Sequence, residues 1–156
     1  MTNPTPSFPV TPGPADETLS WLLDKFVEKT TGVTGALLVS RDGLKTAVSG
    51  LDTDQADKAA AWVSSLHSLA RSAGSIIGST PGGFRQGIVE NDGFLMFVTS
   101  ADHAAAGQAG AGSRLVGSVL GVLAQPGANP DTIGFEMGLL VKSVADHLRT
   151  ATRGGR

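Results

Sequence analysis

Two glycine-rich segments are the first places where this chain could do chemistry, because such loops can cradle phosphate groups. They are Gly78-Ser-Thr-Pro-Gly-Gly83 and Gly107-Gln-Ala-Gly-Ala-Gly112. Neither ends in the Gly-Lys-Ser or Gly-Lys-Thr sequence of a P-loop, and neither lies between an expected parallel strand and a helix. We therefore interpret both as ordinary loops and expect no nucleotide or other cofactor site in them.

A nucleophilic serine lacks the sequence context that would activate it. Neither Gly74-Ser-Ile-Ile-Gly78 nor Gly117-Ser-Val-Leu-Gly121 has the Gly-x-Ser-x-Gly spacing that exposes a serine on a sharp strand-to-helix turn. The chain has no cysteine, which excludes a thiol nucleophile and any cysteine-based metal site. No catalytic serine or cysteine is expected.

The three histidines, His67, His103 and His147, are far apart in the sequence and form no His-x-x-x-His pair. His67 and His147 fall on amphipathic helical patterns, where we expect solvated or hydrogen-bonded rings. The acidic residues are dispersed, and those near helix starts are explained by the helix dipole. The sequence predicts no catalytic, cofactor-binding or metal-binding residue and no enzyme activity, which favours a binding or regulatory module.

Composition narrows the class of protein further. A length of 156 residues fits one domain, and a net charge of −2 gives no electrostatic reason to bind nucleic acid. No stretch approaches 18 consecutive apolar residues, so we expect no membrane insertion. The first ten residues lack the basic and apolar regions of a signal peptide, and we therefore expect a cytoplasmic protein.

Apolar residues at helical spacing predict three helices, over residues 16–30, 54–73 and 130–150. In the second, Ala59, Val63, Leu66, Ala70 and Ala73 are expected to form the buried stripe, with Trp62 and Leu69 widening it. Asn129 and Pro130 are a typical start for the third helix. Five of the eight prolines precede Asp16. We therefore expect a disordered proline-rich tail over residues 1–15, a folded domain over 16–150 and a flexible basic tail over 151–156.

Asp-Gly turns between apolar runs predict two β-hairpins. The first joins residues 35–39 to 44–48, and the second joins 84–90 to 94–100. Residues 115–124 are almost continuously apolar, which indicates a fifth strand in a central position. The glycine- and alanine-rich residues 101–112 are expected to form a loop. The order predicts an α+β fold: one antiparallel five-stranded sheet with helices on both faces.

Several segments, in this order and spacing, resemble the Roadblock/dynein light chain family, and most closely its actinobacterial branch. The resemblance covers about residues 19–148. The segments are Gly35-Ala-Leu-Leu-Val-Ser-Arg-Asp-Gly-Leu44, Ala47-Val-Ser-Gly50, the helix that contains Ala59-Ala-Ala-Trp62, Gly93-Phe-Leu-Met-Phe-Val98, Val119-Leu-Gly-Val-Leu-Ala124 and Gly134-Phe-Glu-Met-Gly-Leu-Leu-Val141.

The resemblance implies a Roadblock (profilin-like) fold and a homodimer in which the second helix and third strand of each copy meet. It also implies the absence of catalytic residues, a small Ras-like GTPase as partner and a sensor-kinase-like protein as a further partner. The hypothesis is a non-catalytic dimeric regulator or scaffold that binds and modulates a small Ras-like GTPase in bacterial signalling. The alternative is a small-molecule-sensing, PAS-like or profilin-like domain, against which the few aromatic residues argue.

The second predicted helix carries more apolar width than one face of a sheet needs, and residues 84–90 alternate weakly, as an edge strand does. Pairing of two copies across a two-fold axis would cover both features. The candidate dimer-interface residues are Ala59, Trp62, Val63, Leu66, Leu69, Gln86 and Ile88.

Overall fold

A computed structural model of the chain describes residues 14–40, 42–78, 84–101 and 118–154. Its helices are α1 (Pro14–Lys29), α2 (Thr53–Ser72), the short 3₁₀ helix η1 (Ala73–Ile77) and α5 (Pro130–Gly154). Its strands are β1 (Val33–Val39), β2 (Lys45–Ser49), β3 (Gln86–Asn91), β4 (Phe94–Ser100) and β5 (Val119–Ala124). None of the described helices is long and apolar enough to cross a membrane.

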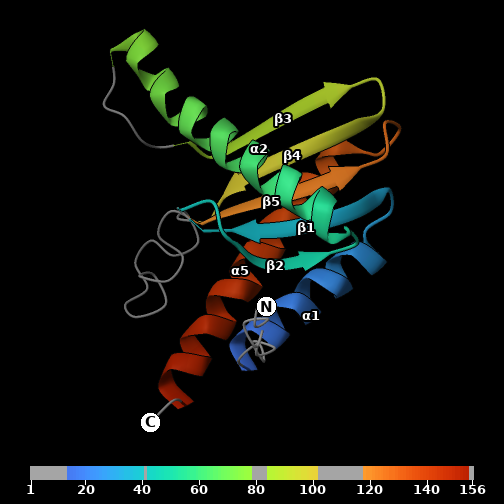
Figure 1. Cartoon of the computed structure of the whole chain (residues 1–156), viewed down its shortest axis with the longest axis vertical. Coiled ribbons are helices and arrows are strands. Elements are labelled where there is room, and N and C mark those ends of the chain that lie inside the picture. The colour runs from blue at the N-terminus through green and yellow to red at the C-terminus, as the bar shows by residue number, and fades with distance from the viewer. Residues whose placement is uncertain (1–13, 41, 79–83, 102–117, 155–156) are drawn as a thin grey trace, which may run out of the picture.

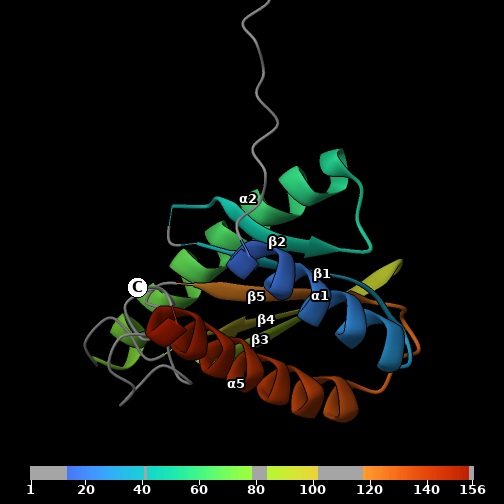
Figure 2. The same ribbon diagram turned by 90° about the horizontal axis from the view of Figure 1, so that it is seen from below.

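The five strands form one sheet in the order β2-β1-β5-β4-β3, and every neighbouring pair is antiparallel. The predicted sheet is confirmed, and β5 occupies the centre as its apolar sequence indicated. Helix α2 crosses one face of the sheet, while α1 and α5 cover the other (Figures 1 and 2). Strands β2 and β3 are the two edges, so among the strands that the structure describes β3 has β4 as its one neighbour.

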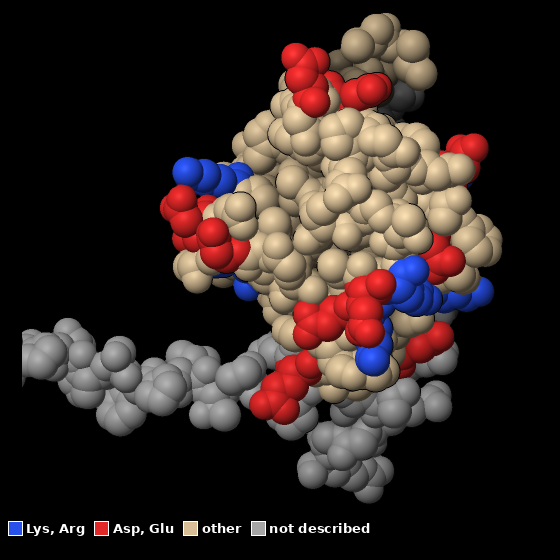
Figure 3. Space-filling model, turned by 90° about the vertical axis from the view of Figure 1, so that its right-hand side faces the viewer, with Lys and Arg blue, Asp and Glu red and all other residues tan. Residues whose placement is uncertain are grey.

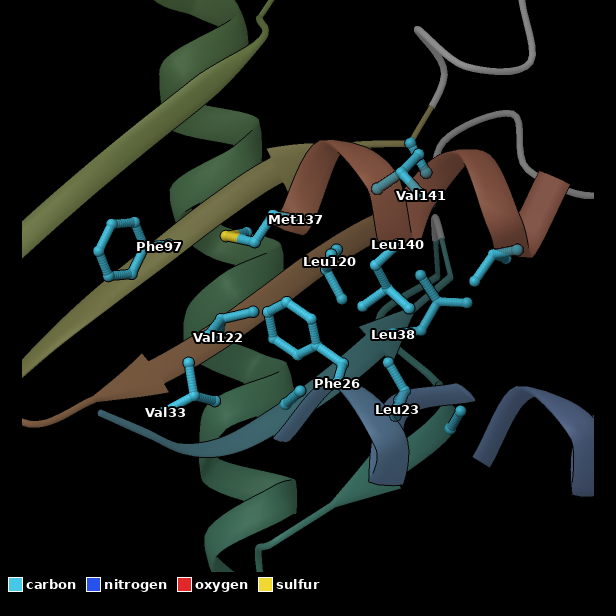
Figure 4. Packing of buried hydrophobic residues seen from close by; sticks show 14 of the residues in the cluster. Leu23, Phe26, Val33, Leu38, Phe97, Leu120, Val122, Met137, Leu140 and Val141 are labelled. Atoms are coloured by element: carbon cyan, nitrogen blue, oxygen red, sulfur yellow. The ribbon is translucent and has the colours of Figure 1, made fainter. Parts of the chain in front are cut away.

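The main core lies between the sheet and the pair α1 and α5 (Figure 4). Phe26 of α1 and Phe97 of β4 are its largest buried side chains. Met137 from α5 and Leu120 and Val122 from β5 pack with them. A smaller cluster fills the other face, where Ala59, Ala60 and Val63 of α2 meet Leu37, Val39, Met96, Val98 and Val119 of the sheet.

Helix α5 begins as the sequence predicts. The side-chain Oδ1 of Asn129 accepts hydrogen bonds from the backbone N–H groups of Asp131 and Thr132, at 2.9 and 3.2 Å. The helix continues to Gly154, beyond the expected end at residue 150, because Ala151 favours helix and no glycine occurs between residue 150 and Gly154. Most of the expected basic tail is therefore helical, and residues 1–13 of the expected N-terminal tail lie outside the described residues.

Helix α2 starts at a capping box: the Asp52 carboxylate accepts from the backbone N–H of Gln55, whose side chain accepts from the backbone N–H of Asp52. The predicted buried stripe is only partly correct. The buried residues are Ala56, Ala59, Ala60, Val63 and His67. Ala70 is half-buried and Ala73 is exposed, because this end of the helix continues past the edge of the sheet (Figure 1). Strand β5 starts at Val119; residues 102–117, with most of the expected 101–112 loop, lie outside the described residues.

Candidate interaction surface

The outer side of α2 carries exposed apolar side chains beside the β3 edge. Trp62 is 39% exposed and Leu69 is 69% exposed, and Leu66 between them is half-buried. These residues are three or four positions apart, so they share one side of the helix. The described chain therefore presents an apolar stripe, which we call the α2 stripe, defined by Trp62, Leu66 and Leu69.

Two predicted interface residues of α2 instead face the chain's own sheet. Val63 is fully buried, so its assignment to a contact with a second copy is corrected. Gly121 of β5 explains this: a Cβ there would lie 2.8 Å from Cγ2 of Val63 and 3.0 Å from Cδ2 of Leu37. The glycine lets α2 approach the central strand closely. Ala59, 9% exposed, is also mostly covered, although it reaches the groove described next.

An apolar groove of about 300 Å³ runs between the first half of α2 and the sheet. We call it the α2–β4 groove. Its lining residues are Leu51, Gln55, Lys58, Ala59, Trp62, Phe94, Met96 and Leu123. Lys58 is the one charged lining residue, and its side-chain Nζ lies 3.1 Å from Oδ2 of Asp54 with both side chains exposed. Because Trp62 belongs to both features, the groove and the α2 stripe form one continuous apolar surface.

The β3 strand presents an unpaired backbone edge. The carbonyl of Arg85 accepts a hydrogen bond from the backbone N–H of Ser100 at 3.1 Å. In an antiparallel pair the inward and outward backbone groups alternate residue by residue. The backbone groups of Gln86, Ile88 and Glu90 therefore point away from β4, and another strand could pair with them.

The side chains of Gln86 and Ile88 point to the opposite face from α2. Ile88 pairs with Phe97, which lies in the core under α1 and α5. A groove of about 640 Å³ opens there between β3 and α5, lined by Gln86, Gly87, Ile88, Pro130, Asp131, Gly134 and Phe135. Ile88 is 49% exposed and Phe135 is 67% exposed. The predicted residues therefore lie on two faces of the sheet: those of α2 lie over its central strands and past its edge, and Gln86 and Ile88 lie on β3 and face the other way.

Two features of this region were missed by sequence reasoning. The ring of His67 meets that of Phe84 edge to face, with centroids 5.6 Å apart, and His67 is buried. The 3₁₀ helix η1 exposes Ile76 and Ile77 almost completely, at 84% and 83%. The sequence could have indicated this exposure, because Ile76 and Ile77 are adjacent and two consecutive apolar residues do not both fit one buried stripe of a helix.

The described residues contain no group of three or more acidic or histidine side chains that could hold a metal ion. His147 is half-buried on α5, and His103 lies outside the described residues. Figure 3 views the end of the sheet where β3 and β5 finish and β4 begins. The middle of this surface carries no Lys, Arg, Asp or Glu, and the charges lie around its margin.

Comparison with known proteins identifies the family of the chain. A family model described as the Roadblock/LC7 domain matches residues 19–106. A crystal structure of a Roadblock/LC7 domain from Streptomyces avermitilis is 42% identical, with a TM-score of 0.68, over 83% of this chain and 96% of that one. A second Roadblock/LC7 domain from the same organism is 28% identical, with a TM-score of 0.59, over 80% and 96%.

A more distant structure shares the fold. The gliding protein MglB from Thermus thermophilus is 15% identical, with a TM-score of 0.67, over 89% of this chain and 94% of that one. No curated protein matches the sequence. The family model covers more than half of the chain, and the 42% identical domain aligns along nearly its whole length. This protein belongs to the Roadblock/LC7 domain family.

Proposed function

We propose that this protein is a non-catalytic, homodimeric regulator or scaffold that binds a small Ras-like GTPase. The observation that carries the proposal is the α2 stripe beside the unpaired β3 edge. Trp62 and Leu69 are exposed there together with the outward backbone groups of Ile88. An apolar helix next to a free strand edge is an aggregation hazard in a monomer, and self-pairing covers both.

The proposed dimer joins β3 to β3 in antiparallel register, with a two-fold axis perpendicular to the sheet. Both α2 helices then lie on one face of a single ten-stranded sheet, and the two α2 stripes meet. Gln86 and Ile88 from both copies lie together on the opposite face. Of the predicted interface residues, Trp62, Leu66, Leu69, Gln86 and Ile88 are the ones we propose to lie at or beside such a junction.

The regulatory role is supported by the family to which the chain belongs and by the surface chemistry of the described residues. That surface offers apolar contact area and no cluster of metal ligands. A joined sheet with two α2 helices on one face gives a broad, rigid surface suited to a globular partner. Ras-like GTPases are globular partners of this kind. A sensor-kinase-like protein is a further proposed partner.

The test of the proposal has two stages. Light scattering at micromolar concentration should give a dimer. Small Ras-like GTPases from the same genome, loaded with GDP or a GTP analogue, should then be immobilised and tested for binding and for changed exchange or hydrolysis rates. The protein alone should hydrolyse no GTP. A well-folded monomer, or a dimer that binds none of the GTPases in either state, would contradict the proposal.

The α2–β4 groove favours one alternative, a small-molecule sensor. Its volume of about 300 Å³ and mostly apolar lining are within the range of ligand pockets. A sensor of this kind would be stabilised thermally by a metabolite and would not need a second copy. A panel of apolar metabolites in a thermal-shift assay, run beside light scattering, separates the two functions.

A further inference from the structure

The C-terminal end of α2 and the helix η1 form an arm that has no core of its own. None of the η1 residues is buried, and Ile76 and Ile77 lie almost entirely in solvent. Figure 1 shows this end of the helix continuing past the sheet beyond the start of β3. Leu69, 69% exposed, lies on the same overhanging end. The arm, defined as residues 69–77, therefore carries apolar side chains that no described part of its own chain buries.

The α2–β4 groove is the complementary feature, because it has apolar walls and no apolar side chain filling it. It lies at the other end of α2, where the helix begins, next to Phe94 at the start of β4 and Leu123 near the end of β5. The end of the sheet beside it carries no charged side chain over its middle (Figure 3). Lys58, the charged residue of the groove lining, has its ammonium group beside the Asp54 carboxylate with both side chains exposed, so an apolar arm can enter while that ion pair stays at the rim.

We infer that in the dimer the arm of each copy fills the α2–β4 groove of the other, so that each groove is complete only when two copies associate. This inference rests on the proposed dimer. It extends the contact between the two copies to residues 73–77 of one copy and to the groove residues Phe94, Met96 and Leu123 of the other. A two-fold axis perpendicular to the sheet reverses the direction of α2. The end that overhangs β3 in one copy thereby comes to the start of α2 in the other.

The inference includes a register for the two helices. We place the two-fold axis at the level of Ser64, midway between Trp62 and Leu66, so that Leu69 reaches the groove. In an antiparallel pair of α2 helices centred at Ser64, a residue that follows Ser64 by a given number of positions faces the residue that precedes Ser64 by the same number in the other copy. Leu69 then faces Ala59 inside the groove, and Ile77 faces Leu51 at its mouth. The exposed apolar residues of the arm thus meet groove-lining residues at both positions.

The absence of cysteine from the chain allows a direct test of this register. Lys58 and Ala70 are symmetric about Ser64, and the Lys58 side chain is 79% exposed. Twelve residues of helix separate them by about 18 Å in one copy. A disulfide needs Cα atoms within about 7 Å, so a K58C/A70C variant can close one only between copies. Mild oxidation should convert this variant to a covalent dimer on a non-reducing gel.

The matched control pairs A70C with K25C, because Lys25 lies on α1 on the opposite face of the sheet and its side chain is 55% exposed. This variant, and the single-cysteine variants K58C and A70C, should remain largely unlinked. Cross-linking of the control as efficient as that of the K58C/A70C variant would mean random collision and would overturn the inference.

The arm itself is tested by the double variant I76D/I77D. Sedimentation should show a dimer dissociation constant raised by at least about tenfold, while circular dichroism shows unchanged helix and strand content, because η1 buries nothing in its own copy. The matched control is Leu44→Asp, 66% exposed in the β1–β2 turn, which should leave the constant unchanged.

The outcomes separate the inference from the proposed dimer. A dimer that gives no K58C/A70C disulfide and tolerates I76D/I77D would overturn the arm and leave the β3 pairing standing. A monomeric natural protein would overturn both. A covalent K58C/A70C dimer together with weakened association of I76D/I77D would support both.

Discussion

The rings of His67 and Phe84 are in edge-to-face contact at an interplanar angle of 71°, and this contact ties α2 to the segment that enters β3. Phe84 also covers Gly87, since a Cβ at Gly87 would lie 3.5 Å from Cζ of the Phe84 ring. The Phe84 side chain, which belongs to neither α2 nor β3, therefore links the position of β3 to that of α2.

Replacing Phe84 by alanine removes this contact. We expect the free energy of unfolding to fall by about 2 kcal/mol, less than for a fully buried phenylalanine because Phe84 is half-buried. Urea denaturation measures the change. Leu44→Ala is the control, because that side chain is 66% exposed and should cost less than about 0.5 kcal/mol. Equal losses for the two variants would contradict the proposed link.

Gly121→Ala should destabilise the protein by about 1–3 kcal/mol through overpacking. The new methyl group would press on Val63, whose branched side chain has few alternative rotamers. Val63→Ala removes the obstructing methyl groups. The double variant should therefore lose less stability than the sum of the two single variants, by about 1 kcal/mol. Strict additivity in chemical denaturation would show that Gly121 is not required for the approach of α2.

Trp62→Glu should convert the dimer to a monomer, because the proposed interface would bury an unpaired charge. Leu69→Glu should act in the same way. The matched control is Trp21→Glu on α1, where the side chain is 55% exposed on the other face of the sheet. Light scattering should show a dimer for the control and monomers for the other two. A dimeric, folded Trp62→Glu variant would place the interface elsewhere.

Asn129→Ala should cost about 1 kcal/mol of stability, because two backbone N–H groups at the start of α5 lose their acceptor. Asn129→Asp keeps an acceptor oxygen and adds a charge that the helix dipole favours, so it should keep the stability of the natural protein. Thermal denaturation of the three proteins checks this. A loss in the aspartate variant as large as in the alanine variant would exclude capping as the cause.

Deleting residues 1–13 should leave the thermal midpoint nearly unchanged, because their prolines supply no repeating apolar face. Calorimetry of the full and shortened chains tests this expectation. A fall of more than a few degrees would indicate that the segment packs on the domain.

The parts of the fold that the sequence predicted are those governed by local chemistry. The Asp92-Gly93 turn forms the second hairpin, with Asn91 paired to Phe94 across it. Asn129 and Pro130 start α5, and the apolar run at residues 119–124 forms the central strand. In each case a turn, a cap or a run of apolar residues acts over a few positions, so neighbours in the sequence suffice.

The candidate interface was harder to predict, because it depends on how α2 crosses the sheet. Alanines occupy several positions around this helix and do not fix which side is buried. The close approach at Gly121 places Val63 against the sheet and leaves Leu69 outside. The direction of Ile88 follows from its pairing with Phe97, a partner in another strand. Neither fact can be read from residues near α2 or β3 alone.

The second edge of the sheet determines how large an assembly can become. Strand β2 has only five residues, its pairing with β1 is irregular between Leu38 and Val39, and Gly50 turns the chain at a φ of +75°. Lys45 lies on this strand, with its Nζ 2.6 Å from Oδ1 of Asp57. Short length, an irregular register and a lysine all oppose the addition of another strand. In the proposed dimer, pairing at β3 uses the same edge of both copies, so growth through the sheet would end at two chains and the sheet would not extend into a fibre.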